Sequence, residues 1–253
     1  MKRVSIGLIL LFFSIPCLAV DSQKDPFDSV QWADMSAAFL RGKPVVFDTK
    51  VRVMAPNVAE NPMMVPLTID ATDLKDVKEV IVFADFNPIP LIARYFPLQA
   101  KANLSLRFKI QQSSPVRAAV LTADGVWHIG GAWIDSAGGG CTVASTGRLS
   151  GDWADTLGDI RGKRWLLKTR NRIRLRISHP MDTGLVAGIP AFYIERLSFF
   201  NDQSEPLAMI ELFEPVNENP VLSFDFNDDS LSSNIFMTGG DNNGNEFEAE
   251  FSQ

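Results

Sequence analysis

Residues 104–110, LSLRFKI, decide the fold class because their apolar and polar side chains alternate. Ser105, Arg107 and Lys109 each stand between two apolar residues. This period of two predicts a strand with one face in a core and the other in solvent. Residues 172–178, RIRLRIS, repeat the pattern with arginine as the polar partner. Both halves of the chain are therefore expected to contain half-buried strands.

Short runs of this kind, separated by turn residues, recur along the chain. In the first half they cover residues 45–53, 64–70, 79–84, 104–110, 116–121 and 126–134. In the second half they cover residues 172–178, 191–199, 207–213, 221–226, 235–238 and 246–251. Because no comparable helix separates these runs, the pattern predicts an all-β protein made of two tandem antiparallel β-sandwiches.

Two segments depart from the strand pattern. Residues 25–41 predict a short helix, with Asp25 as its cap, Pro26 at its first position and Gly42 at its end. Residues 136–164 are poor in strand formers, and residues 152–160 could form two helical turns. The predicted order is a leader (1–19), a first sandwich domain (20–135), a partly helical connector (136–164) and a second sandwich domain (165–253).

The N-terminal residues resemble a secretory signal peptide. Lys2 and Arg3 precede an apolar run that is too short to span a bilayer comfortably. We expect cleavage after Ala19, which removes Cys17. Acylation of Cys17 as a lipoprotein is the alternative, although Pro16 stands where a small residue is preferred. After cleavage, Cys141 is the only cysteine left in an oxidising compartment, where an unpaired thiol must be buried, paired with another chain, or used.

Composition narrows the possible partners. The 253 residues are 46% hydrophobic and 21% charged, which is typical of a globular protein. A formal charge of −6 argues against nucleic acid or an anionic membrane as the main partner. Two His and two Cys are too few for an ordinary four-ligand zinc site once Cys17 is removed. No metal site and no cofactor are predicted.

Cys141 is the residue most suited to chemistry. It follows Gly138, Gly139 and Gly140, and we call residues 136–142, SAGGGCT, the arm. Glycine gives the backbone wide conformational freedom, so the arm is predicted to be mobile and its sulfur exposed to solvent. A fixed catalytic cysteine needs a base and oxyanion donors in place, which such a tether opposes. A carrier thiol is the preferred interpretation, and an intermolecular disulfide, an ordinary turn cysteine and an enzyme nucleophile stay open.

Other polar residues receive structural interpretations. His128 is expected to pack at a sheet face rather than act as a base for Cys141, and His179 to lie in a turn or an interface. Asp228, Asp229 and Asp241 are interpreted as solvated turn residues. A copper(I) site is conceivable but unsupported by ligand spacing; it would draw on a His and on Met54, Met63, Met64, Met181 and Cys141.

Several segments resemble the sulfur-oxidation proteins SoxY and SoxZ. Residues 51–66, VRVMAPNVAENPMMVP, are similar to the first strands of SoxY, and Gly139-Gly140-Cys141 to its carrier motif. Residues 177–190, ISHPMDTGLVAGIP, resemble SoxZ, as do residues 218–224 around Asn219-Pro220. The order is that of a natural SoxY–SoxZ fusion, similar to the SoxYZ-like carriers associated with quinoprotein dehydrogenases.

This resemblance implies two immunoglobulin-like sandwiches and a periplasmic protein that is not an enzyme. Cys141 would hold sulfur intermediates covalently, Gly138–Gly140 would form its flexible arm, and periplasmic sulfur-oxidation enzymes or a quinoprotein dehydrogenase system would be its partners. No cofactor is implied. An accessory protein of such a dehydrogenase, using Cys141 for a disulfide with another chain, is the alternative. The family motif ends its chain, whereas Cys141 is followed by Thr142 and a second domain.

Overall fold

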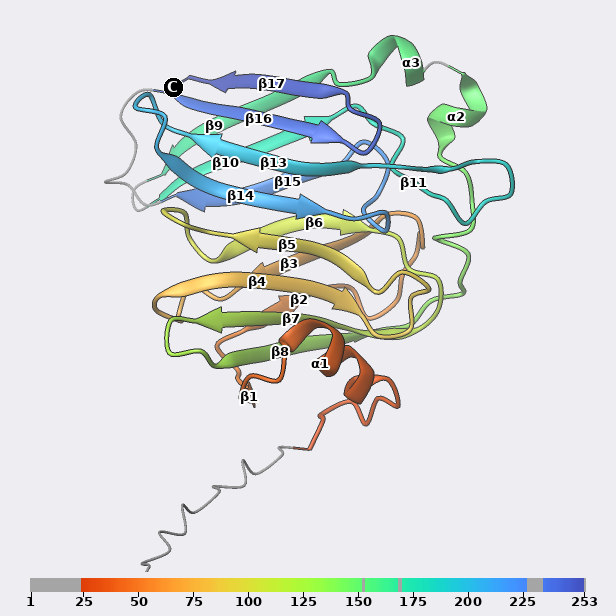
Figure 1. Cartoon of the computed structure of the whole chain (residues 1–253). Coiled ribbons are helices and arrows are strands. Elements are labelled where there is room, and N and C mark those ends of the chain that lie inside the picture. The colour runs from red at the N-terminus through yellow and green to blue at the C-terminus, as the bar shows by residue number, and fades with distance from the viewer. Residues whose placement is uncertain (1–23, 152, 168–169, 227–233, 253) are drawn as a thin grey trace, which may run out of the picture.

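The structure is a computed structural model that describes residues 24–151, 153–167, 170–226 and 234–252. The predicted leader and its Cys17 lie outside these residues, as do Asp228 and Asp229. Two β-sheets stack face to face, with the N-terminal half of the chain at one end of the stack and the C-terminal half at the other (Figure 1). The all-β prediction is confirmed.

The larger sheet has nine strands in the order β1-β8-β7-β4-β5-β14-β13-β16-β17. Their bounds are β1 Val45–Phe47, β4 Val77–Ala84, β5 Leu91–Phe96, β7 Ser114–Thr122, β8 Trp127–Ile134, β13 Ile194–Phe200, β14 Pro206–Leu212, β16 Ile235–Asp241 and β17 Glu246–Phe251. Apart from the parallel β1–β8 pair, neighbouring strands in this sheet are antiparallel.

The smaller sheet has six strands in the order β2-β3-β6-β15-β10-β9. Their bounds are β2 Arg52–Met54, β3 Val65–Asp70, β6 Asn103–Phe108, β9 Ile160–Leu167, β10 Arg170–Ile177 and β15 Val221–Phe226. A separate two-stranded ladder pairs β11 Asp182–Thr183 with β12 Ala191–Phe192. The strand predicted from residues 104–110 is β6, and its alternation appears as alternating burial.

The two sandwiches are joined edge to edge, so each sheet runs through both halves. In the larger sheet β5 pairs with β14, and in the smaller sheet β6 pairs with β15 through Ser105 and Ser223. One apolar core continues across the seam, where the rings of Tyr95 and Phe224 lie 6.0 Å apart. The two immunoglobulin-like units therefore form one continuous body.

The N-terminal helix is shorter than predicted. α1 spans Trp32–Leu40, because the Asp25 carboxylate accepts hydrogen bonds from the backbone N–H groups of Phe27 and Ser29 and closes a separate turn. Asp25 also pairs with the buried Arg117 at 2.7 Å, which ties this turn to the sheet. The helix covers the outer side of the larger sheet through Leu40 and its neighbours.

Three strands were missed from the sequence: β5, β9 and the two-residue strand β11. β5 follows two prolines and carries Arg94 in its middle, which hides its alternation. β9 begins at Ile160, so the helix predicted over residues 152–160 is wrong in extent. Among the residues that the structure describes in this connector, the helical segments are α2 Thr146–Ser150 and α3 Trp153–Thr156. Gly162 lies under the ring of Phe251, where a Cβ would come within 2.2 Å of Cε1. The glycine therefore permits β9 to pack closely there.

The Cys141 arm as candidate functional site

The sulfur of Cys141 is buried, and the expectation of a solvent-exposed thiol is wrong. The residue has 0% of its surface exposed, and its thiol donates a hydrogen bond to the carbonyl of Lys109 at 3.6 Å. The arm runs along one side of the sandwich from the first half toward the second (Figure 1). It is docked against the body of the protein rather than extended from it.

The glycines make this docking possible. Gly138 and Gly139 have φ angles of +94° and +91°, which side chains other than glycine disfavour. The N–H of Gly140 donates to the carbonyl of Ile110 at 3.1 Å, and a Cβ on Gly140 would lie 2.2 Å from the carbonyl oxygen of Pro62. Because glycine has no side chain, the backbone of the arm can approach other backbone groups closely. The prediction of a mobile arm considered the conformational freedom of glycine and not this close approach.

Residues from both halves of the chain hold the backbone of Cys141. Its N–H donates to the side-chain oxygen of Gln111 at 3.1 Å, and its carbonyl accepts a hydrogen bond from the Thr183 hydroxyl at 2.6 Å. Gln111 follows β6 in the first half, whereas Thr183 belongs to β11 in the second. The two segments that carried the SoxY-like and SoxZ-like resemblance therefore meet at the cysteine.

Lys109 places a cation beside the thiol. It is 1% exposed, and its Nζ donates to the carbonyl of Met181. Burial lowers the pKa of Lys109 to about 8, a shift opposed by Cys141, Asp182 and Glu218. Burial raises the pKa of Cys141 to about 11, and the nearby Lys109 charge opposes that shift. The docked thiol is therefore protonated at neutral pH and is a poor nucleophile.

The chain just after the arm is held as well. The Glu218 carboxylate accepts the backbone N–H groups of Thr146 and Gly147 at 2.7 and 2.8 Å. Arg148 pairs with the buried Asp182 at 2.7 Å, next to Thr183. These contacts fix the start of α2 to the second half. If Cys141 moves, the chain that follows it therefore stays attached to the body of the protein.

Both histidines have structural partners. His128 on β8 pairs its Nδ1 with Asp48 at 2.8 Å. His179 is buried, its Nδ1 accepts the N–H of Met181 and its Nε2 lies 3.4 Å from Asp241. Burial lowers the pKa of His179 to about 4, so the ring is neutral. Within the described part of the chain, no hydrogen bond joins either ring to Cys141.

Methionines named for the conceivable copper site lie elsewhere in the structure. The Met181 sulfur accepts the N–H of Ile194 at 3.3 Å in the core, while Met54 and Met64 are exposed. Among the described residues, no group of three His, Cys, Asp or Glu side chains is arranged to hold a metal ion. Asp241, interpreted as a solvated turn residue, is instead buried beside His179.

The contacts of the arm were not evident from sequence. Gln111 and Lys109 lie at the end of a predicted strand, and Lys109 was assigned to its polar face. Thr183 was part of a quoted motif without an individual role. The one available signal was the SoxZ-like motif that contains Thr183. The sequence alone did not show that this motif contacts the arm.

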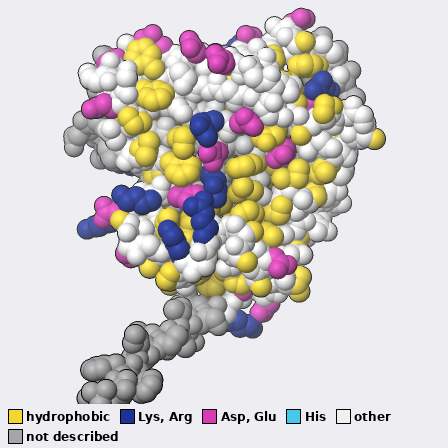
Figure 2. All heavy atoms as spheres, viewed as in Figure 1, with side chains coloured by type: hydrophobic (Ala, Val, Ile, Leu, Met, Phe, Trp, Pro, Cys, Tyr) yellow, Lys and Arg dark blue, Asp and Glu magenta, His cyan; other side chains and the backbone are white. Residues whose placement is uncertain are grey.

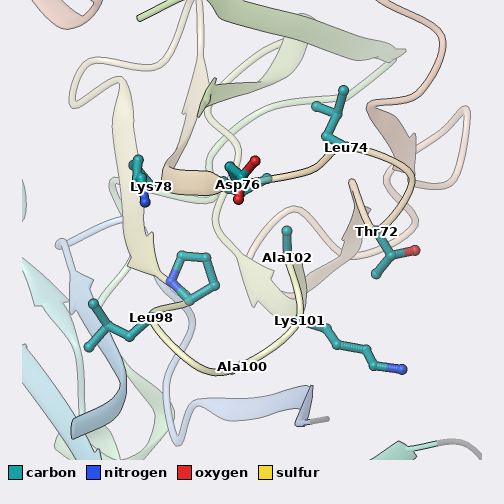
Figure 3. A pocket seen from close by; sticks show the side chains of 10 residues that line it. Thr72, Leu74, Asp76, Lys78, Leu98, Ala100, Lys101 and Ala102 are labelled. Atoms are coloured by element: carbon teal, nitrogen blue, oxygen red, sulfur yellow. The ribbon is translucent and has the colours of Figure 1, made fainter. Parts of the chain in front are cut away.

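A separate hollow of about 500 Å³ lies at the opposite end of β6 from Cys141. Figure 3 shows Asp76 and Lys78 on one side of it and Leu98, Ala100 and Lys101 on the other. These residues precede β6, whereas Lys109 and Gln111 follow it, so the hollow does not adjoin the arm.

No described helix combines the length and apolar character needed to cross a bilayer.

Comparison with known proteins bears on both halves. The family described as sulfur oxidation protein SoxY matches residues 36–141, ending at the cysteine, and sulphur oxidation protein SoxZ matches residues 167–252. No curated protein matches the sequence. A solved structure, the sulfur carrier protein SoxY from Chlorobium limicola f thiosulfatophilum, is 22% identical and covers 42% of this chain and 96% of its own, with a TM-score of 0.38.

The two family matches follow one another in a single chain and leave residues 1–35, 142–166 and 253 outside them. The Sox system is periplasmic, and its carrier works with sulfur-oxidation enzymes without being an enzyme itself. The chain therefore contains a SoxY domain followed by a SoxZ domain, and these sulfur-carrier domains give it a carrier role in sulfur oxidation.

Proposed function

We propose that Cys141 is the covalent attachment point and that the chain presents sulfur intermediates on it to periplasmic enzymes. The assignment rests on the position of Cys141 at the contact between the two halves. The SoxY match ends at Cys141, and Thr183 of the SoxZ-like motif donates a hydrogen bond to its carbonyl.

Loading requires the arm to leave its docking site. In the docked state the thiol has a pKa of about 11 and no exposed surface. A free cysteine has a pKa of about 8.5, so release would raise the thiolate fraction near neutral pH by roughly two orders of magnitude. The docked and released arm would thus correspond to a protected and a reactive thiol.

The bond formed at Cys141 constrains the loading enzyme. Joining the sulfur of the thiol to the sulfane sulfur of thiosulfate releases one proton and two electrons. The two electrons pass to an oxidant that the loading enzyme holds, and the proton passes to solvent. Exchange with an existing S–S bond needs no such oxidant, since the leaving thiolate takes up the electron pair.

Intact-mass measurement of protein from its native periplasm tests the assignment. We expect additions of sulfur, sulfite or thiosulfonate size that are removed by a thiol reductant and are absent in Cys141→Ser. Consistent absence of additions from protein of cells grown on thiosulfate would count against the carrier role. N-terminal sequencing of the same sample tests the proposed cleavage after Ala19.

The same sample tests the alternative role at a quinoprotein dehydrogenase. A non-reducing gel would then contain a reductant-sensitive adduct of this chain with another protein, dependent on Cys141. We found no described residue that points to such a dehydrogenase, so this association stays an expectation from the resemblance.

A further inference from the structure

The outer side of the six-stranded sheet carries a concentration of cations. Along β10 the residues at alternate positions point outward, and Arg174 and Arg176 are exposed. The register places Arg174 opposite Lys163 and Arg176 opposite Arg161 on β9. Arg107 on β6 alternates with buried core residues and so faces the same side. We call these five residues, Arg107, Arg161, Lys163, Arg174 and Arg176, the basic face.

The basic face is not explained by folding. Among the described residues, none of its five cations forms an ion pair with a carboxylate. Two cross-strand pairs instead set like charges directly opposite one another, an arrangement that is destabilising in antiparallel sheets. It also stands out in a chain whose formal charge is −6. A surface that opposes stability in this way suggests a selected function.

Several other cations on the two sheets are paired with carboxylates. At the other end of the same sheet, Arg172 pairs with Asp225 at 2.7 Å and Arg52 pairs with Asp70 at 2.9 Å. On the nine-stranded sheet, Arg196 lies 3.3 Å from Glu211. Figure 2 shows acidic and basic side chains side by side over the middle of that face. Among the described side chains of the six-stranded sheet, the cations without a carboxylate partner therefore lie toward one end.

That end is where Cys141 lies. β6 and β10 both run antiparallel to β15, so they point in the same direction. Just beyond β6, the carbonyl of Lys109 accepts the thiol, and beyond β10 the chain continues to Thr183, which holds the carbonyl of Cys141. The basic face leads along both strands to the arm.

Two hollows shape this surface. One of about 280 Å³ lies across the seam between the halves and is lined by Arg107, Arg174, Ser105 and Ser223 among others. The other, of about 230 Å³, is lined by Arg161 and Arg176 and also by two acids, Asp159 and Glu218. Glu218 is engaged with the backbone of Thr146 and Gly147, directly after the arm.

We propose that the basic face is the docking surface for the enzymes that act on Cys141, and that these present an acidic surface beside their active-site entrance. This inference rests on the carrier function proposed above. Opposite charges steer and orient an encounter, and a carrier with an acidic body and one basic face would approach with that face first. A partner seated there would have the arm at the edge of its contact area.

A protein partner fits this surface better than a lipid bilayer. The hollows give the face a relief that a complementary protein surface can fill, whereas a flat anionic membrane would also meet the acidic remainder of the chain. Because the cations flank the arm, a docked partner would also lie beside Gln111 and Thr183. It could then replace the hydrogen bonds that join these residues to Cys141.

The test uses the full mature chain and a charge-reversed variant, Arg174→Glu with Arg176→Glu. Lys43→Glu with Lys75→Glu is the matched control, since both lysines are exposed on loops outside the six-stranded sheet. The probe is a fluorescent decaglutamate peptide, followed by anisotropy. We expect the charge-reversed variant to bind it at least about tenfold more weakly than wild type, and the control to change little. Binding should weaken as salt rises toward about 0.5 M.

A second arm measures the function. Each protein is incubated with periplasmic extract of thiosulfate-grown cells, and the rate of mass addition at Cys141 is followed. We expect loading of the charge-reversed variant to be slower by about tenfold at low salt, while Arg174→Gln with Arg176→Gln gives an intermediate rate. Thermal unfolding is measured in parallel. The Glu and Gln double variants at Arg174 and Arg176 should both have a midpoint temperature of unfolding equal to or above that of wild type.

The outcomes are distinct. Equal peptide binding by wild type and the charge-reversed variant, or equal loading rates, would overturn the docking surface. Binding of phosphatidylglycerol vesicles that depends on Arg174 and Arg176, with loading unchanged, would assign the face to a membrane instead. If wild type never acquires a conjugate, the carrier function fails, and the peptide experiment still decides whether the face recognises acidic surfaces.

Discussion

The hydroxyl of Thr183 donates a 2.6 Å hydrogen bond to the backbone carbonyl of Cys141, across 42 positions of sequence. The donor belongs to the SoxZ half and the acceptor ends the SoxY match. The position of Cys141 thus depends on a contact that neither half can make alone.

Removing this contact should release the arm. Thr183→Val keeps the shape of the side chain but loses the donor, and the net loss of about 1 kcal/mol would raise the population of the released arm by about fivefold. We expect Cys141 to react with iodoacetamide faster by a similar factor. Thr238→Val, on the exposed side of β16, is the control. Equal alkylation rates in all three proteins would show that Thr183 does not hold the arm.

Crowding the arm should act more strongly. Gly140→Ala would place a Cβ 2.2 Å from the Pro62 carbonyl oxygen, so the arm cannot keep its docked position without backbone movement. We expect the alkylation pH profile of Cys141 to shift from about 11 toward the ordinary thiol range, measured by stopped-flow labelling. Gly125→Ala, in a turn with φ of +85° and open space around it, controls for backbone strain alone. A profile that stays near 11 in Gly140→Ala would contradict the docked geometry.

Acid should destabilise the second half through His179. Its folded pKa of about 4 lies below its ordinary value of 6.5, so the unfolded chain takes up a proton first as the pH falls. The free energy of unfolding should therefore decrease between pH 6.5 and pH 4, by up to about 3 kcal/mol in total. Urea titrations of wild type and His179→Gln check this. The variant should lose most of the decrease, and an identical slope in both proteins would exclude His179 as its source.

The seam between the halves should resist separation. Asn103 on β6 donates to the Asp225 carboxylate at 2.7 Å and accepts the Asp225 N–H at 3.0 Å, which links the two halves beside the shared core. Asn103→Ala leaves a buried carboxylate with fewer donors, and we expect a loss of about 2 kcal/mol in urea unfolding. Asn243→Ala, in an exposed hairpin turn, should cost little. Two separate transitions in wild type would contradict a single continuous body.

Much of the fold could be predicted because the alternation of buried and exposed side chains along a strand is visible in its local sequence. The alternation in residues 104–110 and 172–178 corresponds to β6 and β10, and the turn at Asp241-Asn242-Asn243-Gly244 connects β16 to β17. β9 was missed because Gly162 and three basic residues, Arg161, Lys163 and Arg164, interrupt its apolar residues. Its strand conformation is stabilised by pairing with β10, which the local sequence does not show.

The environment of Cys141 could not be predicted for a different reason. Three glycines are compatible both with a mobile tether and with a backbone seated against carbonyl groups, and only the shape of the partner surface distinguishes the two. That surface is built from Pro62, Gln111 and Thr183, which are distant in sequence. Local patterns therefore identified the cysteine and missed its burial.

The pairing of β5 with β14 has a consequence for the behaviour of the protein at low concentration. A carrier assembled from two separate chains falls apart below its dissociation constant, and its activity then depends on equal synthesis of both. Here the two halves are translated together and share their sheets, so dilution cannot part them. A cell could keep this carrier at very low copy number without losing working molecules.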